Sequence, residues 1–458
     1  MVDPASPTPF PRRVAVTLVV VVALLLATSA GVVAVRQTGD DGPTQATPAP
    51  SPTTTDRPES PSTTSASTLS AEQAATVETL KAQVSEVRGL PWKRTLDVRI
   101  VSQDELARLV REYSAKEREE GGERLAGDEA TLKLLGLIPD RTDYAETLDD
   151  LLAGGVLGFY DDETKELVVG GDPDDDLDVA TRNVMAHELA HALTDQHFDY
   201  GPATKAMEDG DRTEELAGYV ALLEGDAELV SILWAERHLS EEEQVEAFFG
   251  QSGGNPLAAL QAPRYVLEAL RFPYEDGLEF VDRLHESGGF AAVDAAYRRP
   301  PTSTEHILHP ELYLSGQAPS PPRLPDLASA TGCTRVDGGA VGEFDMAQVL
   351  REHIGTERAD AAAAGWNGDT FGLVRCGSTT GLADRWRTDG PEDATELMRA
   401  LADWARGWSG SNRAVAGDGR FSGPSGAGRI VRAGNSVDIV LADDVATAER
   451  VGRALPPV

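Results

Sequence analysis

Cysteine and basic residues are scarce in this sequence of 458 residues. Its 2 cysteines are too few for a disulfide scaffold or for a zinc site made of four cysteines. Lysine and arginine together number 41 against 76 aspartates and glutamates, which gives a formal net charge of −35. Because so acidic a chain repels a phosphate backbone, the composition argues against nucleic acid as a partner.

The sequence contains one long hydrophobic run near its N-terminus. Residues 14–35 carry no charge, and about 20 apolar residues suffice for a helix to span a bilayer. Arg12 and Arg13 precede the run, so the positive-inside rule places residues 1–13 in the cytoplasm. The sequence therefore predicts a transmembrane helix at 14–35 that contacts the lipid bilayer, a single-pass cell-membrane location, and an extracytoplasmic position for the rest of the chain. A cleaved signal peptide ending at Ala30 is the alternative.

The composition changes twice more along the chain. Residues 36–68 are rich in Ser, Thr and Pro and cannot bury a core, so they are predicted to be a disordered linker. Gly, Pro and Ser cluster again around 315–325. We therefore expect a folded domain at 69–320, a second linker at 321–340 and a C-terminal domain at 341–458.

Local patterns predict the elements of both folded parts. In the first part they indicate a helix at 71–87 capped by Ser70, a strand at 96–101, a helix at 103–120, a hairpin of 157–160 with 166–169, and helices from 179 to 296. In the second they indicate helices at 344–364 and 392–408, strands at 371–376 and 382–387, a hairpin around 434–435 and a final helix. The expected fold class is α+β: a mainly helical domain with a small N-terminal β-sheet, followed by a C-terminal α+β domain. Cys333 and Cys376 are expected to form a disulfide, with two free buried thiols as the alternative.

The most informative stretch is VMAHELAHAL, residues 184–193. His187 and His191 are four residues apart, so one face of a helix presents both imidazoles to the same point. Glu188 lies beside them and is placed to take a proton from a metal-bound water. This pattern predicts a catalytic zinc site, for which a third protein ligand is needed.

Two residues compete for the position of third ligand. His197 has the spacing of a longer zinc motif, but Thr194 stands where that motif has glycine. If the helix continues, His197 lies about 240° around the axis from His191, on another face. Glu224 is the other choice, on a second predicted helix where small residues allow a close approach. Two further carboxylates on that helix remain open as alternatives, Asp226 and Glu228, and Glu228 could instead orient a ligand histidine.

The segment HELAHALTDQHF, followed by ALLEGDAELV, resembles the gluzincin group of zinc metallopeptidases. More narrowly, the chain resembles a family of membrane-anchored bacterial proteins with HExxH and EGxA signatures. The shared features extend to GFYD at 158–161, FPYEDG at 272–277 and AVDAAYRRPPTSTEHILHPELY at 292–313.

The resemblance implies a zincin-like domain with one zinc ion per chain. It implies His187, His191 and Glu224 as the zinc ligands and Glu188 as the general base. It also implies that the strand at 157–160 lies above the cleft, where an extended peptide would add to its edge. An oxyanion also needs a hydrogen-bond donor, and His309 is our first choice, with two alternatives, Tyr297 and His306.

The function expected from the sequence is that of a membrane-anchored, extracytoplasmic zinc endopeptidase. Its substrate would be a protein or peptide, and its mechanism would use a zinc-activated water with Glu188 as general base. One alternative is a non-catalytic envelope binding or scaffold protein that retains a zinc site. Another is hydrolysis of a cell-wall peptide.

Overall fold

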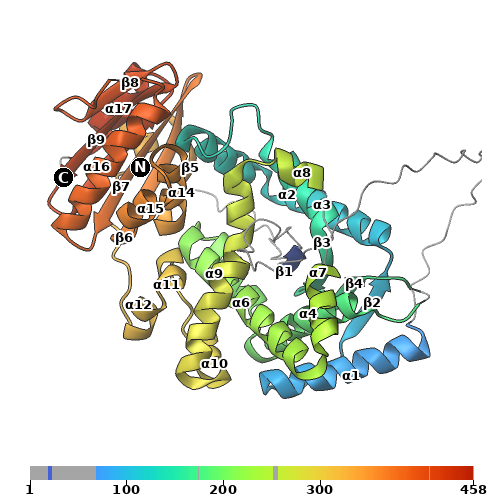
Figure 1. Cartoon of the computed structure of the whole chain (residues 1–458). Helices are drawn as coiled ribbons and strands as arrows, with labels where there is room; N and C mark the ends of the chain where they lie inside the picture. The colour runs from blue at the N-terminus through green and yellow to red at the C-terminus, as the bar shows by residue number, and fades with distance from the viewer. Residues whose placement is uncertain (1–18, 23–68, 174, 251–255, 412, 457–458) are drawn as a thin grey trace, which may run out of the picture.

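The computed structural model describes residues 19–22, 69–173, 175–250, 256–411 and 413–456. It is mixed α and β, as predicted: a mainly helical part with a small sheet, then a C-terminal part built on a larger sheet (Figure 1). The small sheet has the strand order β1-β3-β4-β2, and the larger one has the order β5-β6-β7-β10-β9-β8.

The described helices and strands fall into two parts along the chain. Those of the first part are β1 (Val19–Val22), α1 (Ala71–Arg88), β2 (Asp97–Val101), α2 (Gln103–Leu135), α3 (Tyr144–Gly155), β3 (Val156–Asp161), β4 (Glu166–Gly170), α4 (Val179–Phe198), α5 (Gly201–Glu208), α6 (Thr213–His238), α7 (Glu241–Gly250), α8 (Pro256–Gln261), α9 (Arg264–Gly288), α10 (Phe290–Arg298), α11 (Thr304–Leu308) and α12 (Pro310–Ser315). Those of the second part are α13 (Leu327–Thr331), β5 (Thr334–Gly339), α14 (Gly342–Ile354), α15 (Thr356–Ala363), β6 (Trp366–Cys376), β7 (Thr379–Thr388), α16 (Pro391–Trp408), β8 (Arg420–Gly423), β9 (Gly426–Ala433), β10 (Ser436–Ala442) and α17 (Val445–Ala454).

The prediction of a transmembrane helix at 14–35 is corrected by the structure. In the described part of the chain, none of the helices combines the length and the apolar character needed to cross a bilayer. Of the hydrophobic run, residues 19–22 are described, and they form β1, which pairs antiparallel with β3. The physical reason is that a run of valines suits a strand as well as an apolar helix. The remainder of the run, residues 1–13 and residues 36–68 lie outside the described residues.

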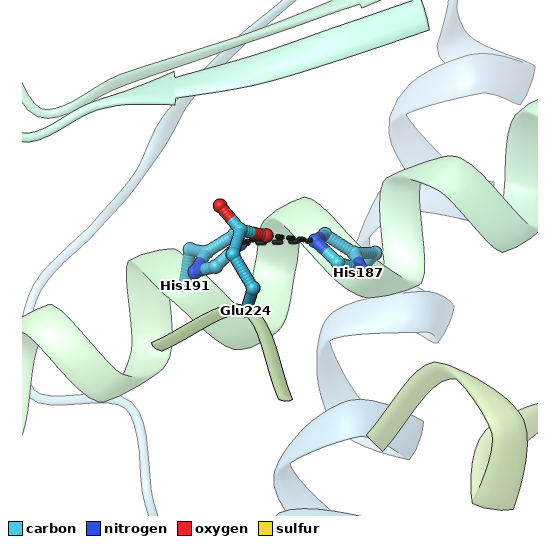
Figure 2. A group of neighbouring side chains, drawn as sticks. All are labelled: His187, His191 and Glu224. Carbon is cyan, nitrogen blue, oxygen red and sulfur yellow. Dashed lines mark hydrogen bonds and ion pairs between the residues drawn. The ribbon is translucent and has the colours of Figure 1, made fainter. Parts of the chain in front are cut away.

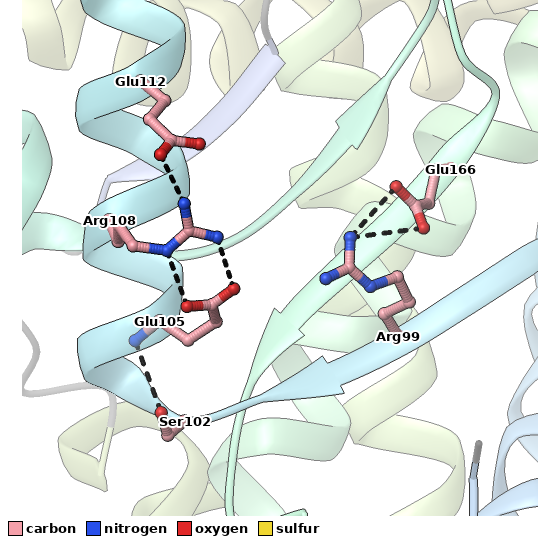
Figure 3. A network of polar contacts seen from close by, with 6 residues as sticks. All are labelled: Arg99, Ser102, Glu105, Arg108, Glu112 and Glu166. Atoms are coloured by element: carbon pink, nitrogen blue, oxygen red, sulfur yellow. Dashed lines mark hydrogen bonds and ion pairs between the residues drawn. The ribbon is translucent and has the colours of Figure 1, made fainter. Parts of the chain in front are cut away.

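Side-chain contacts at the start of α2 and on the neighbouring strands are shown in Figure 3. The Ser102 hydroxyl accepts a hydrogen bond from the Glu105 backbone N–H and so caps α2. On the exposed face of this helix Arg108 pairs with Glu105 and with Glu112. Across the parallel pair β2–β4, an Arg99 guanidinium nitrogen lies 3.4 Å from a carboxylate oxygen of Glu166. These surface pairs add little stability, but they agree with the register of the small sheet.

Helix α2 is longer than the predicted helix at 103–120, because it continues through Gly121 and Gly122 to Leu135. Its last turn buries three leucines in the core shared with the C-terminal part, at positions 132, 134 and 135. This burial outweighs the cost of three glycines inside the helix, Gly127 being the third, which is about 1 kcal/mol each. The helix ends where Gly136 adopts a left-handed conformation with φ 82°.

The C-terminal sheet is covered by helices on both faces. Along β10, Ile439 and Leu441 contribute to the core formed with α14 and α16, whereas Val440 and Ala442 face α17. This alternation follows from the two-residue period of a strand. The helix predicted at 344–364 is two helices, α14 and α15, which meet at Gly355 with φ 83°. The disulfide between Cys333 and Cys376 is confirmed, and it joins the turn before β5 to the end of β6.

Helices α6 and α9 approach each other at glycines on both sides. A Cβ atom at Gly225 would fall far inside the van der Waals distance of the Gly277 carbonyl oxygen, and one at Gly277 would do the same with the Ala221 carbonyl oxygen. Gly277 ends the FPYEDG motif, so close helix packing explains this glycine.

We expect Gly277→Ala to lower the stability of the chain by about 1–3 kcal/mol, because α9 must move away from α6. The matched control is Gly122→Ala in α2, where an added Cβ would meet no atom within 4 Å. That control should be neutral or stabilising by up to about 1 kcal/mol, since alanine favours a helix. Thermal unfolding of the two variants checks this, and equal midpoints would contradict the packing argument.

Candidate metal centre

Two buried helices, α4 and α6, carry the side chains of the candidate centre. Helix α4 begins where the Asp178 carboxylate accepts a hydrogen bond from the Thr181 backbone N–H at 2.7 Å, and it ends at Asp199 in a left-handed conformation. Its middle is buried on all sides. His187 and His191 lie one turn apart on the same face of this helix.

Glu224 of α6 completes a group of three side chains (Figure 2). Its Oε2 atom lies 3.3 Å from His187 Nε2 and 3.4 Å from His191 Nε2, and the two Nε2 atoms are 3.0 Å apart. A tetrahedral zinc with bonds of about 2.0–2.1 Å places its ligand atoms about 3.3 Å from one another. The separations and the donor types therefore fit zinc.

Burial gives the two imidazoles the protonation state that a metal ligand needs. The exposed fractions of His187, His191 and Glu224 are 3%, 1% and 3%. Desolvation lowers the pKa of His187 to about 4 and that of His191 to about 3, so both rings are neutral at pH 7. Desolvation raises the pKa of Glu224, and hydrogen bonds from His187 and Tyr274 oppose this rise. Protons therefore compete little with a metal ion for the two rings at neutral pH.

Glu228 lies one turn beyond Glu224 and faces the outer nitrogen of a ligand histidine. Its Oε1 atom is 3.6 Å from His187 Nδ1, which is too long for a direct hydrogen bond but close enough to favour a proton on Nδ1. Burial raises the pKa of Glu228 to about 7. The structure therefore gives this residue the position of a side chain that orients a ligand.

Asp226 is not one of the group of three and belongs to a buried ion pair. Arg88 Nε of α1 lies 2.9 Å from Asp226 Oδ1, and the Tyr297 hydroxyl donates to Asp226 Oδ2 at 2.9 Å. A second arm of the Arg88 guanidinium lies 2.8 Å from Asp294. This network joins α1, α6 and α10 two residues from Glu224, so it holds that part of α6 in place.

Three other histidines that the sequence offered as site residues have partners outside the group of three. His197 Nε2 lies 2.8 Å from the Pro91 carbonyl oxygen, because α4 stays helical to Phe198 and carries His197 on another face. His306 Nε2 lies 2.8 Å from the Gln317 carbonyl oxygen. His309 Nε2 lies 2.8 Å from Glu343 Oε1 of α14, and this contact raises the pKa of His309.

Glu188 lies between α4 and the small sheet. Its side chain is fully buried, and a Cβ added at Gly158 of β3 would lie 3.4 Å from Glu188 Cγ and 3.1 Å from a methyl group of Val184. Glycine in the GFYD motif therefore lets β3 lie directly against the helix that carries both histidines. This places the strand beside the carboxylate that the sequence predicts as general base.

Tyr274 is a site residue that the sequence reasoning did not single out. Its ring stacks on His187 with centroids 6.3 Å apart and an interplanar angle of 29°, and its hydroxyl hydrogen-bonds to Glu224. It follows Pro273, which lies inside α9. The available signal was the FPYEDG motif, to which the sequence alone assigned no chemistry.

Comparisons with known proteins bear on the C-terminal part of the chain. A family described as "Domain of unknown function (DUF8575)" matches residues 331–452, which include the six-stranded sheet. No curated protein and no solved structure matches the chain. The candidate metal centre lies outside the matched region.

Proposed function

We propose that this chain is a zinc-dependent endopeptidase of the gluzincin type, with one zinc ion held by His187, His191 and Glu224. The observation that carries the proposal is the convergence of three buried donor atoms at separations of 3.0–3.4 Å. Burying such polar groups together is costly unless they gain a partner. Two histidines and one glutamate are a ligand set of catalytic zinc, which leaves a fourth position open.

The proposed mechanism assigns separate roles to the side chains around this group. Zinc, when bound, would polarise the scissile carbonyl and lower the pKa of water toward about 7. Glu188 would take the proton of the attacking water and deliver it to the leaving amine. Tyr274 is our choice of hydrogen-bond donor to the oxyanion, because its ring lies against His187 and its hydroxyl reaches Glu224 of the group of three, whereas His309 contacts Glu343 of α14.

The substrate we propose is an extended segment of protein or peptide. Strand β3 pairs with β4 on one edge and with Val19–Val22 on the other. A substrate strand would therefore have to replace β1 in order to add to β3. The net charge of −35 should favour basic over acidic substrates in binding.

The test of this function is whether peptide hydrolysis follows the zinc content. We expect the purified full chain to cleave an unfolded basic protein, to lose this activity with its zinc in a chelator, and to regain it when zinc is added back. Activity that survives removal of the metal would contradict the proposal. A chain that binds one zinc without any turnover would instead support the scaffold alternative.

A further inference from the structure

The C-terminal part contains a cavity lined by arginine side chains. It lies between the hairpin β8–β9, the segment that leads into it, and α17, which are neighbours in Figure 1. Its volume is about 510 Å³, within the usual range of small-molecule sites. Four arginines are among the residues that line it, Arg413, Arg420, Arg429 and Arg453.

The charges in and around this cavity are predominantly positive. Glu449 is the acidic lining residue, and it lies 3.6 Å from Arg453. Asp418 lies 3.5 Å from Arg420, and Arg429 donates to the backbone oxygen of the same aspartate. Among the described residues Arg413 has no ion pair. Four guanidinium groups therefore face two carboxylates, at distances that neutralise exposed charges only weakly.

This local excess of positive charge contrasts with the rest of the molecule. The chain as a whole carries a net charge of −35, so a general attraction for anions does not explain a pocket of arginines. Guanidinium groups bind carboxylate and phosphate oxygens through paired hydrogen bonds. The excess of two positive charges matches the charge of about −1.5 to −2 of a phosphate monoester better than that of a single carboxylate.

An apolar wall stands beside the arginines. Ala427 of β9 lines the cavity and packs in the same small apolar cluster as Ala448 of α17. Val445, at the start of α17, is 53% exposed and also lines the cavity, and Ala448 follows it on the same helix face. An organic group attached to the anion would therefore find apolar surface next to the charges.

We propose that this cavity binds a phosphate monoester that carries an apolar or aromatic group. The cavity is lined by β8, β9 and α17, whereas the candidate metal centre lies on α4 and α6, so this proposal does not depend on the proposed peptidase activity. The ligand could be a free phosphorylated compound or a lipid with a phosphate head group. These two sources share the same recognition chemistry and are separated below.

The decisive variants are at Gly452, which lines the cavity on α17. A Cβ atom at this position would meet no atom within 4 Å, so larger side chains fit without displacing neighbours. Gly452→Glu adds a carboxylate to the cavity, and Gly452→Gln adds a neutral side chain of nearly the same shape. Both should stabilise α17 slightly, because glycine is a poor helix former, so a difference between them reports charge rather than folding.

The binding probe is phenyl phosphate, measured by calorimetry on the full chain at low salt. We expect it to bind more tightly than inorganic phosphate and benzoate, and to weaken as salt is raised. Arg420→Gln and Gly452→Glu should each weaken it by about tenfold or more. Gly452→Gln and the distant exposed variant Arg399→Gln should stay within about twofold of the wild type. Equal affinity for Gly452→Glu and Gly452→Gln, or an equal loss with Arg399→Gln, would overturn the proposal.

Vesicles distinguish the two sources of the phosphate. Flotation with phosphatidylcholine vesicles, with and without phosphatidic acid, should show binding that needs phosphatidic acid and is lost in Gly452→Glu if the ligand is a lipid. Binding of phenyl phosphate without flotation assigns the site to a free compound. If neither probe binds, the cavity has no such ligand and the proposal is wrong.

Discussion

Replacing Glu188 by glutamine should leave the zinc content unchanged and lower peptide hydrolysis by about 10²–10⁴-fold. Glutamine nearly matches glutamate in shape, so β3 can still lie against α4 at Gly158. It cannot accept a proton as a carboxylate does, and it cannot return one to the leaving amine. The measurement is the rate of hydrolysis of an unfolded basic protein, together with the metal content of both forms.

The matched control is Glu236→Gln, an exposed glutamate of α6. It makes the same chemical change away from the candidate centre and should retain wild-type activity. If Glu188→Gln hydrolyses the substrate as fast as this control, then Glu188 is not the general base. Loss of zinc from Glu188→Gln would instead mean that the carboxylate supports the site and not the chemistry.

Removing any one of His187, His191 or Glu224 should abolish stoichiometric zinc binding. Each supplies one of three donor atoms that lie within 4.8 Å of one another, and the ion would be left with two protein ligands. Removal of a residue that orients a ligand typically lowers metal affinity by 10–100-fold. We therefore expect Glu228→Gln to lower the zinc affinity by that factor. The three ligand variants should lower it further.

The variant His197→Ala tests whether Glu224 or His197 is the third zinc ligand. His197 lies on another face of α4 against the Pro91 carbonyl, so its loss should leave one zinc per chain. Metal analysis of His191→Ala, Glu224→Ala and His197→Ala after dialysis makes the comparison. Full zinc in Glu224→Ala together with loss in His197→Ala would refute the gluzincin ligand set.

The pairing of His187 with His191 depends on local sequence, which is why it could be predicted. A spacing of four residues puts both rings on one face of any helix. The same holds for the Ser70 cap of α1, for the hairpin that became β3 and β4, and for the alternating strands of the C-terminal sheet. These features need no information about distant parts of the chain.

The valine run shows where a local pattern is ambiguous. Its hydropathy fits a membrane helix, whereas its β-branched residues also suit a strand, and the structure has Val19–Val22 on the edge of β3. The helix predicted at 344–364 is a similar case. Its apolar period continues through Gly355, but the backbone turns there with a positive φ.

The sequence by itself determined the fold class, most of the elements and the two histidines on one helix face, because these depend on periods of two to four residues. Only the tertiary structure decided that Glu224, 37 residues beyond His187, meets both rings. It also decided that Tyr274 reaches the site and that His309 faces Glu343. Such meetings depend on how helices cross, and here the crossing of α6 and α9 is set by backbone contact at Gly225 and Gly277.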